Sequence, residues 1–117
     1  MANDICHVEI ATADLAASRD FVQRFFGWAV TEMMPEYWLW AAPEGPGGGL
    51  ALSPEPPAEG AIAIYVGVEG LGAALGRATT LGAEVHRPAM VLPGDHGHCA
   101  AIRIPGGAVL GLWSRTA

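Results

Sequence analysis

Basic residues are scarce in this chain, and their scarcity argues against one class of function. Six Lys and Arg residues stand against 12 Asp and Glu residues among 117, which gives a formal net charge of −6 and a sequence pI near 5.0. Nucleic-acid binding needs a clustered basic surface, which six scattered cations do not provide. The acidic balance instead suits a neutral or cationic small-molecule ligand.

Long apolar runs and cysteines are also few. No run reaches the roughly eighteen apolar residues that a membrane span needs, and the first residues lack the basic and apolar regions of a secretory signal. Cys6 and Cys99 lie in apolar, strand-like runs, which predicts buried free thiols in a reducing compartment rather than a disulfide. We therefore expect a cytoplasmic protein without a membrane partner.

What is present is the composition of a folded domain. Hydrophobic residues make up 51% of the chain and charged residues 15%, which excludes a disordered segment. The length predicts a single domain over residues 1–117.

The first half of the chain predicts the element order β-α-β-β-β. Alternating residues predict a strand over 5–10, and Asp14 offers a side-chain cap to a helix that Gly27 ends. Three further strands are expected, at 28–32, 37–40 and 50–52. The Pro- and Gly-rich segment 43–49 is expected to form a turn.

The second half repeats this order, which is the most informative feature of the sequence. The expected elements are a strand over 62–66, a helix over 71–81 ended by Gly82, and strands from Glu84, over 99–103 and over 109–113. Leu15 and Leu71 occupy equivalent places in the two halves. Each half is too short to bury enough apolar surface by itself, so we expect module one (about 4–55) and module two (about 60–115) to complete each other.

Alternation along the first strand separates two kinds of side chain. Cys6, Val8 and Ile10 share one face, which we expect to lie under the helix, and His7 and Glu9 share the other. A ligand site is therefore expected on the side of His7 and Glu9.

Three segments together resemble the vicinal oxygen chelate superfamily, which contains glyoxalase I, extradiol dioxygenases, fosfomycin-resistance transferases and bleomycin-resistance proteins. They are His7–Ile10, the Phe25–Trp28 segment that closes the helix, and Pro105–Trp113. The resemblance covers about residues 4–115. It implies an α+β fold in which two tandem βαβββ modules form a curved, cleft-enclosing β-sheet, with one helix per module on the outside.

The resemblance also implies where a metal would bind. The superfamily's metal enzymes hold one divalent ion with side chains from the first and last strands of their modules. By position these residues are His7, Ala63, Ala51 and Gly111. Only His7 carries a donor, whereas a catalytic divalent site needs about three protein ligands. We therefore expect no metal ion and no other cofactor.

A relocated metal site is the alternative. His96 and His98 share one side of an extended segment, and Glu9 or His86 can supply a third donor. A solvated polar turn is the simpler interpretation of these histidines.

His7 and Glu9 each have two interpretations. His7 is an acid–base group or a hydrogen-bonding group of the cleft, and Glu9 is a functional carboxylate or the partner of Arg103 in a salt link. Both are the candidate catalytic residues.

The aromatic residues of the third strand alternate. Trp38 and Trp40 share one face, while Tyr37 and Leu39 share the other, and one of these sets is expected to line the ligand cleft. The expected ligand-binding set is His7, Glu9, Trp38, Trp40, Tyr65, His98 and Trp113.

The leading prediction is a small-molecule-binding protein of the glyoxalase/bleomycin-resistance type, without the family metal, whose ligand lies in an aromatic, acidic cleft. A metal-dependent lyase, isomerase or dioxygenase with a relocated site is the alternative. A metal-free enzyme with Glu9 or His7 as base is a third interpretation. A homodimer is expected, and the resemblance implies that tandem modules close their sheet either within one chain or across two.

Overall fold

The chain folds into two compact units, each with its own sheet. The computed structural model describes residues 5–55, 60 and 63–117. One unit comprises the described residues up to Glu55 together with Pro105–Gly107, and the other comprises the remaining described residues. The single-domain assignment stays a prediction.

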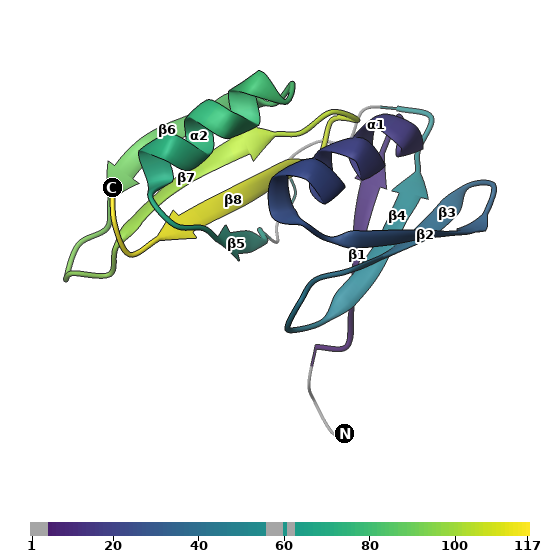
Figure 1. Cartoon of the computed structure of the whole chain (residues 1–117), viewed down its shortest axis with the longest axis horizontal. Helices are drawn as coiled ribbons and strands as arrows, with labels where there is room; N and C mark the ends of the chain where they lie inside the picture. Colours follow the sequence, from purple (N-terminus) through teal and green to yellow (C-terminus); the bar gives the residue numbers. More distant parts are fainter. Residues whose placement is uncertain (1–4, 56–59, 61–62) are drawn as a thin grey trace. The chain divides into compact units, whose positions relative to one another are not determined.

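The first unit has the predicted β-α-β-β-β order. Its elements are β1 (His7–Thr12), α1 (Leu15–Phe21), the short π-helical segment η1 (Val22–Phe26), β2 (Ala29–Met34), β3 (Tyr37–Ala41) and β4 (Gly47–Leu52). The sheet order is β1-β4-β3-β2 (Figure 1). β1 runs parallel to β4, and the other neighbours are antiparallel.

The second unit repeats this arrangement. It contains β5 (Tyr65–Gly67), α2 (Leu71–Thr80), β6 (Glu84–Val91), β7 (His98–Arg103) and β8 (Val109–Ser114). Its strand order, β5-β8-β7-β6, is the order of the first sheet, with β5 parallel to β8. The prediction of two βαβββ modules in an α+β fold is therefore confirmed.

Some boundaries differ from the sequence-based expectation. Gly47–Gly49 belong to β4 rather than to the turn expected over 43–49. Ile62, at the start of the strand expected over 62–66, lies outside the described residues, and β5 begins at Tyr65. Cys6 is a free thiol but exposed, contrary to expectation, because it precedes β1 and no described residue of the first unit covers it.

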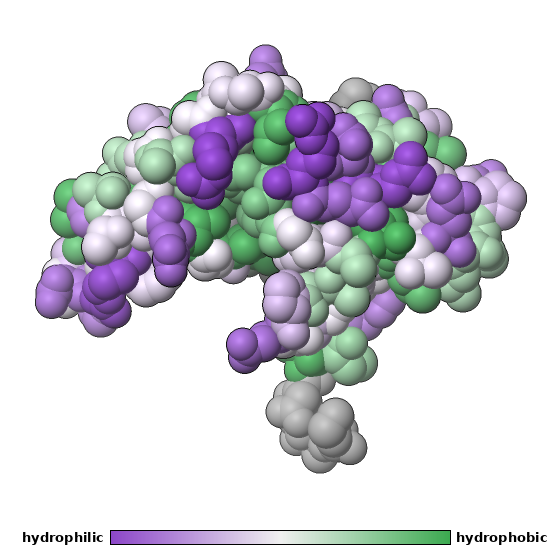
Figure 2. Space-filling view, in the orientation of Figure 1, coloured by the Kyte–Doolittle hydropathy of each residue, from purple (hydrophilic) through white to green (hydrophobic). Residues whose placement is uncertain are grey.

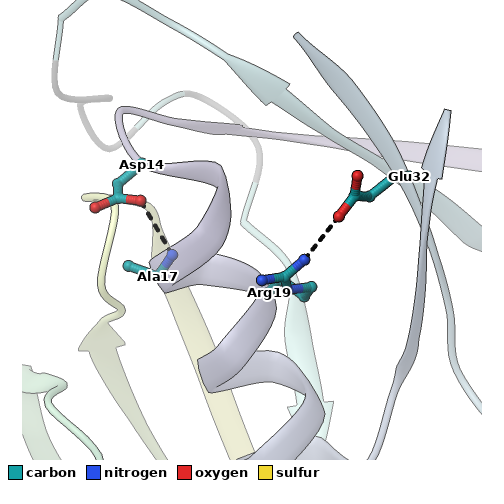
Figure 3. A network of polar contacts seen from close by, with 4 residues as sticks. All are labelled: Asp14, Ala17, Arg19 and Glu32. Atoms are coloured by element: carbon teal, nitrogen blue, oxygen red, sulfur yellow. Dashed lines mark hydrogen bonds and ion pairs between the residues drawn. The ribbon is translucent and has the colours of Figure 1, made fainter. Parts of the chain in front are cut away.

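The helix signals in the first half are confirmed. The Asp14 side chain accepts a hydrogen bond of 3.0 Å from the Ala17 backbone N–H (Figure 3), and Gly27 ends the helical segment with a φ of 74°, a left-handed conformation that favours glycine. The Arg19 guanidinium donates to the Glu32 carboxylate at 3.0 Å, an ion pair that links α1 to β2. Hydrophilic side chains gather over the outer surface of α1 (Figure 2).

The core of the first unit lies between α1 and one face of its sheet. The buried hydrophobic residues of this core include Ile10, Leu15, Phe21, Val22, Trp28, Trp40 and Leu50. The indoles of Trp28 and Trp40 stack with their ring centroids 4.2 Å apart. Because α1 covers this face, the opposite face carries the polar side chains of β1.

The turn Pro105–Gly107 completes the first unit. Ser18 Oγ donates to the Pro105 carbonyl oxygen at 2.7 Å and lies 2.6 Å from Thr12 Oγ1; both hydroxyls are fully buried. Gly106 has a φ of 104°, and a Cβ atom there would overlap both hydroxyl oxygens. Only glycine fits this close approach.

No helix in the described part of the chain is long and apolar enough to cross a membrane.

Candidate functional site

The candidate site lies on the face of the first sheet opposite α1, which we call the His7 face. Ile10 and Thr12 of β1 are buried toward α1, and the exposed side chains of His7 and Glu9 lie on the other side, as alternation predicts. His7 is in register with Gly47, and Glu9 is in register with Gly49. The neighbouring strand therefore presents no side chain beside either residue.

Tyr37 occupies the space that these glycines leave. Its Cα atom is in register with Ala51, but its ring lies over Gly49, where a Cβ atom would overlap the phenol ring. The hydroxyl thereby reaches β1, where Tyr37 Oη lies 2.6 Å from His7 Nε2. The glycine at position 49 is what lets a β3 side chain contact β1 across β4.

Glu9 completes a three-residue cluster. Partial burial, the hydrogen bond that the Tyr37 hydroxyl donates to Glu9, and the charge of Glu9 all raise the pKa of Tyr37 above its ordinary value. The phenol is therefore neutral at pH 7. A phenol has one proton, and a carboxylate only accepts. Because that proton goes to Glu9, His7 Nε2–H donates to Tyr37 Oη, which places a proton on Nε2.

A shallow hollow of about 360 Å³ adjoins the cluster. Its lining is made mostly of small residues together with His7 and Leu39: Cys6, His7, Ala29, Thr31, Leu39, Trp40, Ala41, Gly47 and Gly48. The exposed Leu39 side chain provides apolar contact area beside a polar cluster, which is the mixture that small-molecule sites use.

The structure separates the two aromatic sets of β3. Trp40 is only 6% exposed, and its register partner Gly48 lies under its indole on the α1 side. Trp38 is in register with the buried Leu50 on that same side, with the Arg19 guanidinium 4.9 Å from its ring centroid. The set that shares a face with His7 is therefore Tyr37 and Leu39.

The predicted residues of the second unit also fall on two faces. The Tyr65 ring covers Gly111, its register partner, and is 50% exposed. Trp113 is on the same face, because it alternates with Leu112, and its indole N–H donates to the His96 carbonyl oxygen at 2.7 Å. His98 is in register with the buried Ser114 and so faces the α2 side.

The residues at the superfamily's metal positions do not fit a divalent ion. His7 Nε2 is engaged by Tyr37, Ala51 and Ala63 carry no donor, and the ring of Tyr65 occupies the space that a side chain at position 111 would need. Among the described residues, no three His, Cys, Asp or Glu side chains gather into a metal-binding group.

The sequence predicts His7 and Glu9 for the site and leaves Tyr37 and Leu39 as one of two sets for the cleft, but it does not predict that Tyr37 joins His7 to Glu9. The signal for that contact is the run Gly47–Gly49, which removes three side chains from one strand. By composition, this run predicts a turn. The predicted salt link from Glu9 to Arg103 joins residues of different units and stays a prediction.

Comparison with known proteins assigns the family. Residues 4–110 match the model of the Glyoxalase/Bleomycin resistance protein/Dioxygenase superfamily. The chain belongs to this superfamily. No curated protein matches this superfamily member in sequence.

Solved structures of other proteins share the fold. A glyoxalase-related enzyme from Fulvimarina pelagi is 20% identical, with a TM-score of 0.75 over 96% of this chain and 88% of that chain. The genomically encoded fosfomycin resistance protein FosX from Listeria monocytogenes is 14% identical, with a TM-score of 0.80 over 97% and 94%. A variant of FosX, 13% identical with a TM-score of 0.78 over 97% and 93%, is complexed with Mn(II) and 1S,2S-dihydroxypropylphosphonic acid.

Proposed function

We propose that this superfamily member binds a small molecule without the family's metal ion, and that the ligand lies on the His7 face of the first sheet. The observation that carries the proposal is the 2.6 Å contact between His7 Nε2 and Tyr37 Oη. Among the four residues at the family's metal positions, only His7 has a donor side chain. Its Nε2 atom is occupied by the hydrogen bond with the Tyr37 phenol. A FosX variant, which shares the fold at 13% identity, is complexed with both Mn(II) and an organic phosphonate. Our proposal differs from that complex, because it keeps the small-molecule ligand and omits the metal ion.

The His7 face supplies both parts of a small-molecule site. Leu39 and the small residues of the hollow provide apolar contact, and the cluster of His7, Tyr37 and Glu9 provides directional hydrogen bonds. In the second unit, Tyr65 and Trp113 give a further aromatic surface opposite α2, which we propose as ligand-contacting as well.

Calorimetric titration with Zn²⁺, Mn²⁺ and Fe²⁺ tests the metal-free part. We expect no ion to bind at micromolar concentration in the wild type. If one ion binds per chain, and binding is lost in His7→Ala but kept in His96→Ala, the metal occupies the family position. One ion that is lost in His96→Ala or His98→Ala would show a relocated site. Either result would favour the metal-dependent enzyme.

An NMR screen with a mixture of neutral, cationic and anionic fragments tests the location. We expect bound fragments to shift the backbone amide signals of His7, Tyr37 and Leu39, and to leave those of α1 in place. If fragments shift other surfaces but not these residues, the assignment to the His7 face is wrong.

We also propose that the protein is a homodimer. Large apolar side chains are exposed on the edge strands β2 and β6, where Met33, Met34, Met90 and Val91 are each more than half exposed. A second copy of the chain would cover such side chains. Sedimentation equilibrium is expected to give twice the chain mass of 12.1 kDa. A monomer at micromolar concentration would contradict this.

A further inference from the structure

The Glu9 carboxylate gives the cluster on the His7 face free hydrogen-bond acceptor capacity. The Tyr37 proton is directed to Glu9, and the His7 Nε2 proton is directed to Tyr37. What the cluster still presents is the remaining lone pairs of the Glu9 carboxylate, with His7 Nδ1 beside them. A ligand that hydrogen-bonds to this carboxylate has to supply the protons.

Among the described residues of its own unit, no Lys or Arg side chain pairs with the Glu9 carboxylate. The ion pairs among the described residues of the first unit join Arg19 to Glu32 and Arg24 to Asp20, and neither involves Glu9. Arg19 also lies over Trp38 on the α1 side, away from the His7 face. A carboxylate that meets no cation among the described residues of its own unit is open to a cationic ligand.

The surface next to the carboxylate is flat and apolar. Gly47 and Gly49 leave the β4 backbone uncovered except for the Tyr37 ring. Ala29, Ala41 and Leu39 extend this surface into the hollow of about 360 Å³, which has room for a single aromatic ring.

We propose that the ligand of the His7 face is a small organic cation with N–H donors on a planar or apolar body, such as an amidinium or an aryl ammonium. Its N–H groups donate to the Glu9 carboxylate, and its body lies over the glycines and against Leu39. Tyr37 is a positioning residue, since it holds the carboxylate with its remaining acceptors toward the ligand. This proposal rests on the proposed small-molecule-binding function and deepens it by naming the ligand class.

The test compares three probes of one shape and different charge. Benzamidinium is cationic, benzamide is neutral and benzoate is anionic. Each is titrated into ¹⁵N-labelled full-length protein at low ionic strength, and the amide signals of His7, Glu9, Tyr37 and Leu39 are followed. We expect benzamidinium to shift these signals with at least about tenfold higher affinity than benzamide, because charged hydrogen bonds are the stronger ones. Benzoate is expected not to bind, and added salt should weaken benzamidinium binding.

Variants separate the site charge from the overall charge. Glu9→Gln is expected to lower benzamidinium affinity about threefold to tenfold, as for an exposed ion pair with one strong hydrogen bond. Glu44→Gln removes an equal charge from the exposed turn between β3 and β4 and is expected to leave the affinity unchanged. Tyr37→Phe is expected to weaken benzamidinium binding but to leave benzamide binding, which depends on the apolar surface, nearly unchanged.

The outcomes distinguish this proposal from the function on which it rests. Equal affinity for benzamidinium and benzamide, an equal effect of Glu9→Gln and Glu44→Gln, or no benzamidinium binding at millimolar concentration overturns the ligand class alone. Binding that appears only in Arg103→Gln also overturns it, because Arg103 would then be the partner of Glu9. If the mixed fragments of the previous section also leave the His7 face unmoved, the proposed function fails as well.

Discussion

Replacing Gly106 by alanine should destabilise the first unit strongly, and the structure gives the magnitude. Gly106 has a φ of 104°, where an L-residue costs about 1–2 kcal/mol. The added methyl group would also displace the hydroxyls of Thr12 and Ser18. Loss of the Thr12–Ser18 and Ser18–Pro105 hydrogen bonds adds roughly 1 kcal/mol each. The expected loss is about 3–4 kcal/mol, a large share of the roughly 5–15 kcal/mol that holds a domain folded.

Urea denaturation monitored by tryptophan fluorescence measures this loss, and Gly45→Ala is the matched control. Gly45 has a φ of 84° with nothing within 4 Å of an added Cβ atom, so it reports the backbone strain alone. Ser18→Ala in the Gly106→Ala background removes one of the overlapping oxygens, and the two substitutions should be less than additive. Equal destabilisation by Gly106→Ala and Gly45→Ala would refute the account of a close approach to Thr12 and Ser18.

Four further predictions concern the first unit. Glu9→Gln should lower the pKa of Tyr37 in a ¹³Cζ NMR titration, because an acceptor and a negative charge are lost; an unchanged value would remove Glu9 from the cluster. The pKa of Tyr37 is raised above about 10 in the folded state, so the unfolded chain ionises first. Stability should therefore fall as the pH rises past about 10, and less so in Tyr37→Phe, as measured by urea midpoints. Gly49→Ala should displace the Tyr37 ring and weaken benzamidinium binding, whereas Gly67→Ala, in β5 with open space around its Cβ position, should not; equal affinities would refute this. Asp14→Ala should cost about 1 kcal/mol in the same urea assay through the lost helix cap, and no loss would contradict the capping role.

The fold could be predicted because its signals are local. Asp14 caps the first helix and Gly27 ends it, and both functions follow from the residue type and its place in the chain. The repeat could be recognised because Leu71 and Gly82 occupy the places in the second module that Leu15 and Gly27 occupy in the first. These features need no knowledge of which strands pair.

The candidate site was only half predictable because its central contact is non-local. His7 and Glu9 follow from alternation along one strand, but the position of Tyr37 depends on the register of β1, β4 and β3 together. The run Gly47–Gly49 indicated a turn by composition, whereas its glycines stay in the strand with Trp40 packed over one face and Tyr37 over the other. Alternation also left open which set of β3 faces α1, and the stacking of Trp40 on Trp28 decides it.

The turn at Pro105–Gly107 has a consequence for the order in which the chain acquires its structure during synthesis. A ribosome releases β1 and α1 early, yet the Pro105 carbonyl that Ser18 bonds comes from the far end of the chain. Domains usually fold as units from the N-terminus during translation. Here the first module stays incomplete, with the Ser18 hydroxyl lacking its Pro105 acceptor, until Pro105–Gly107 has emerged. A nascent chain stalled before Pro105 has emerged should therefore be protease-sensitive in both modules.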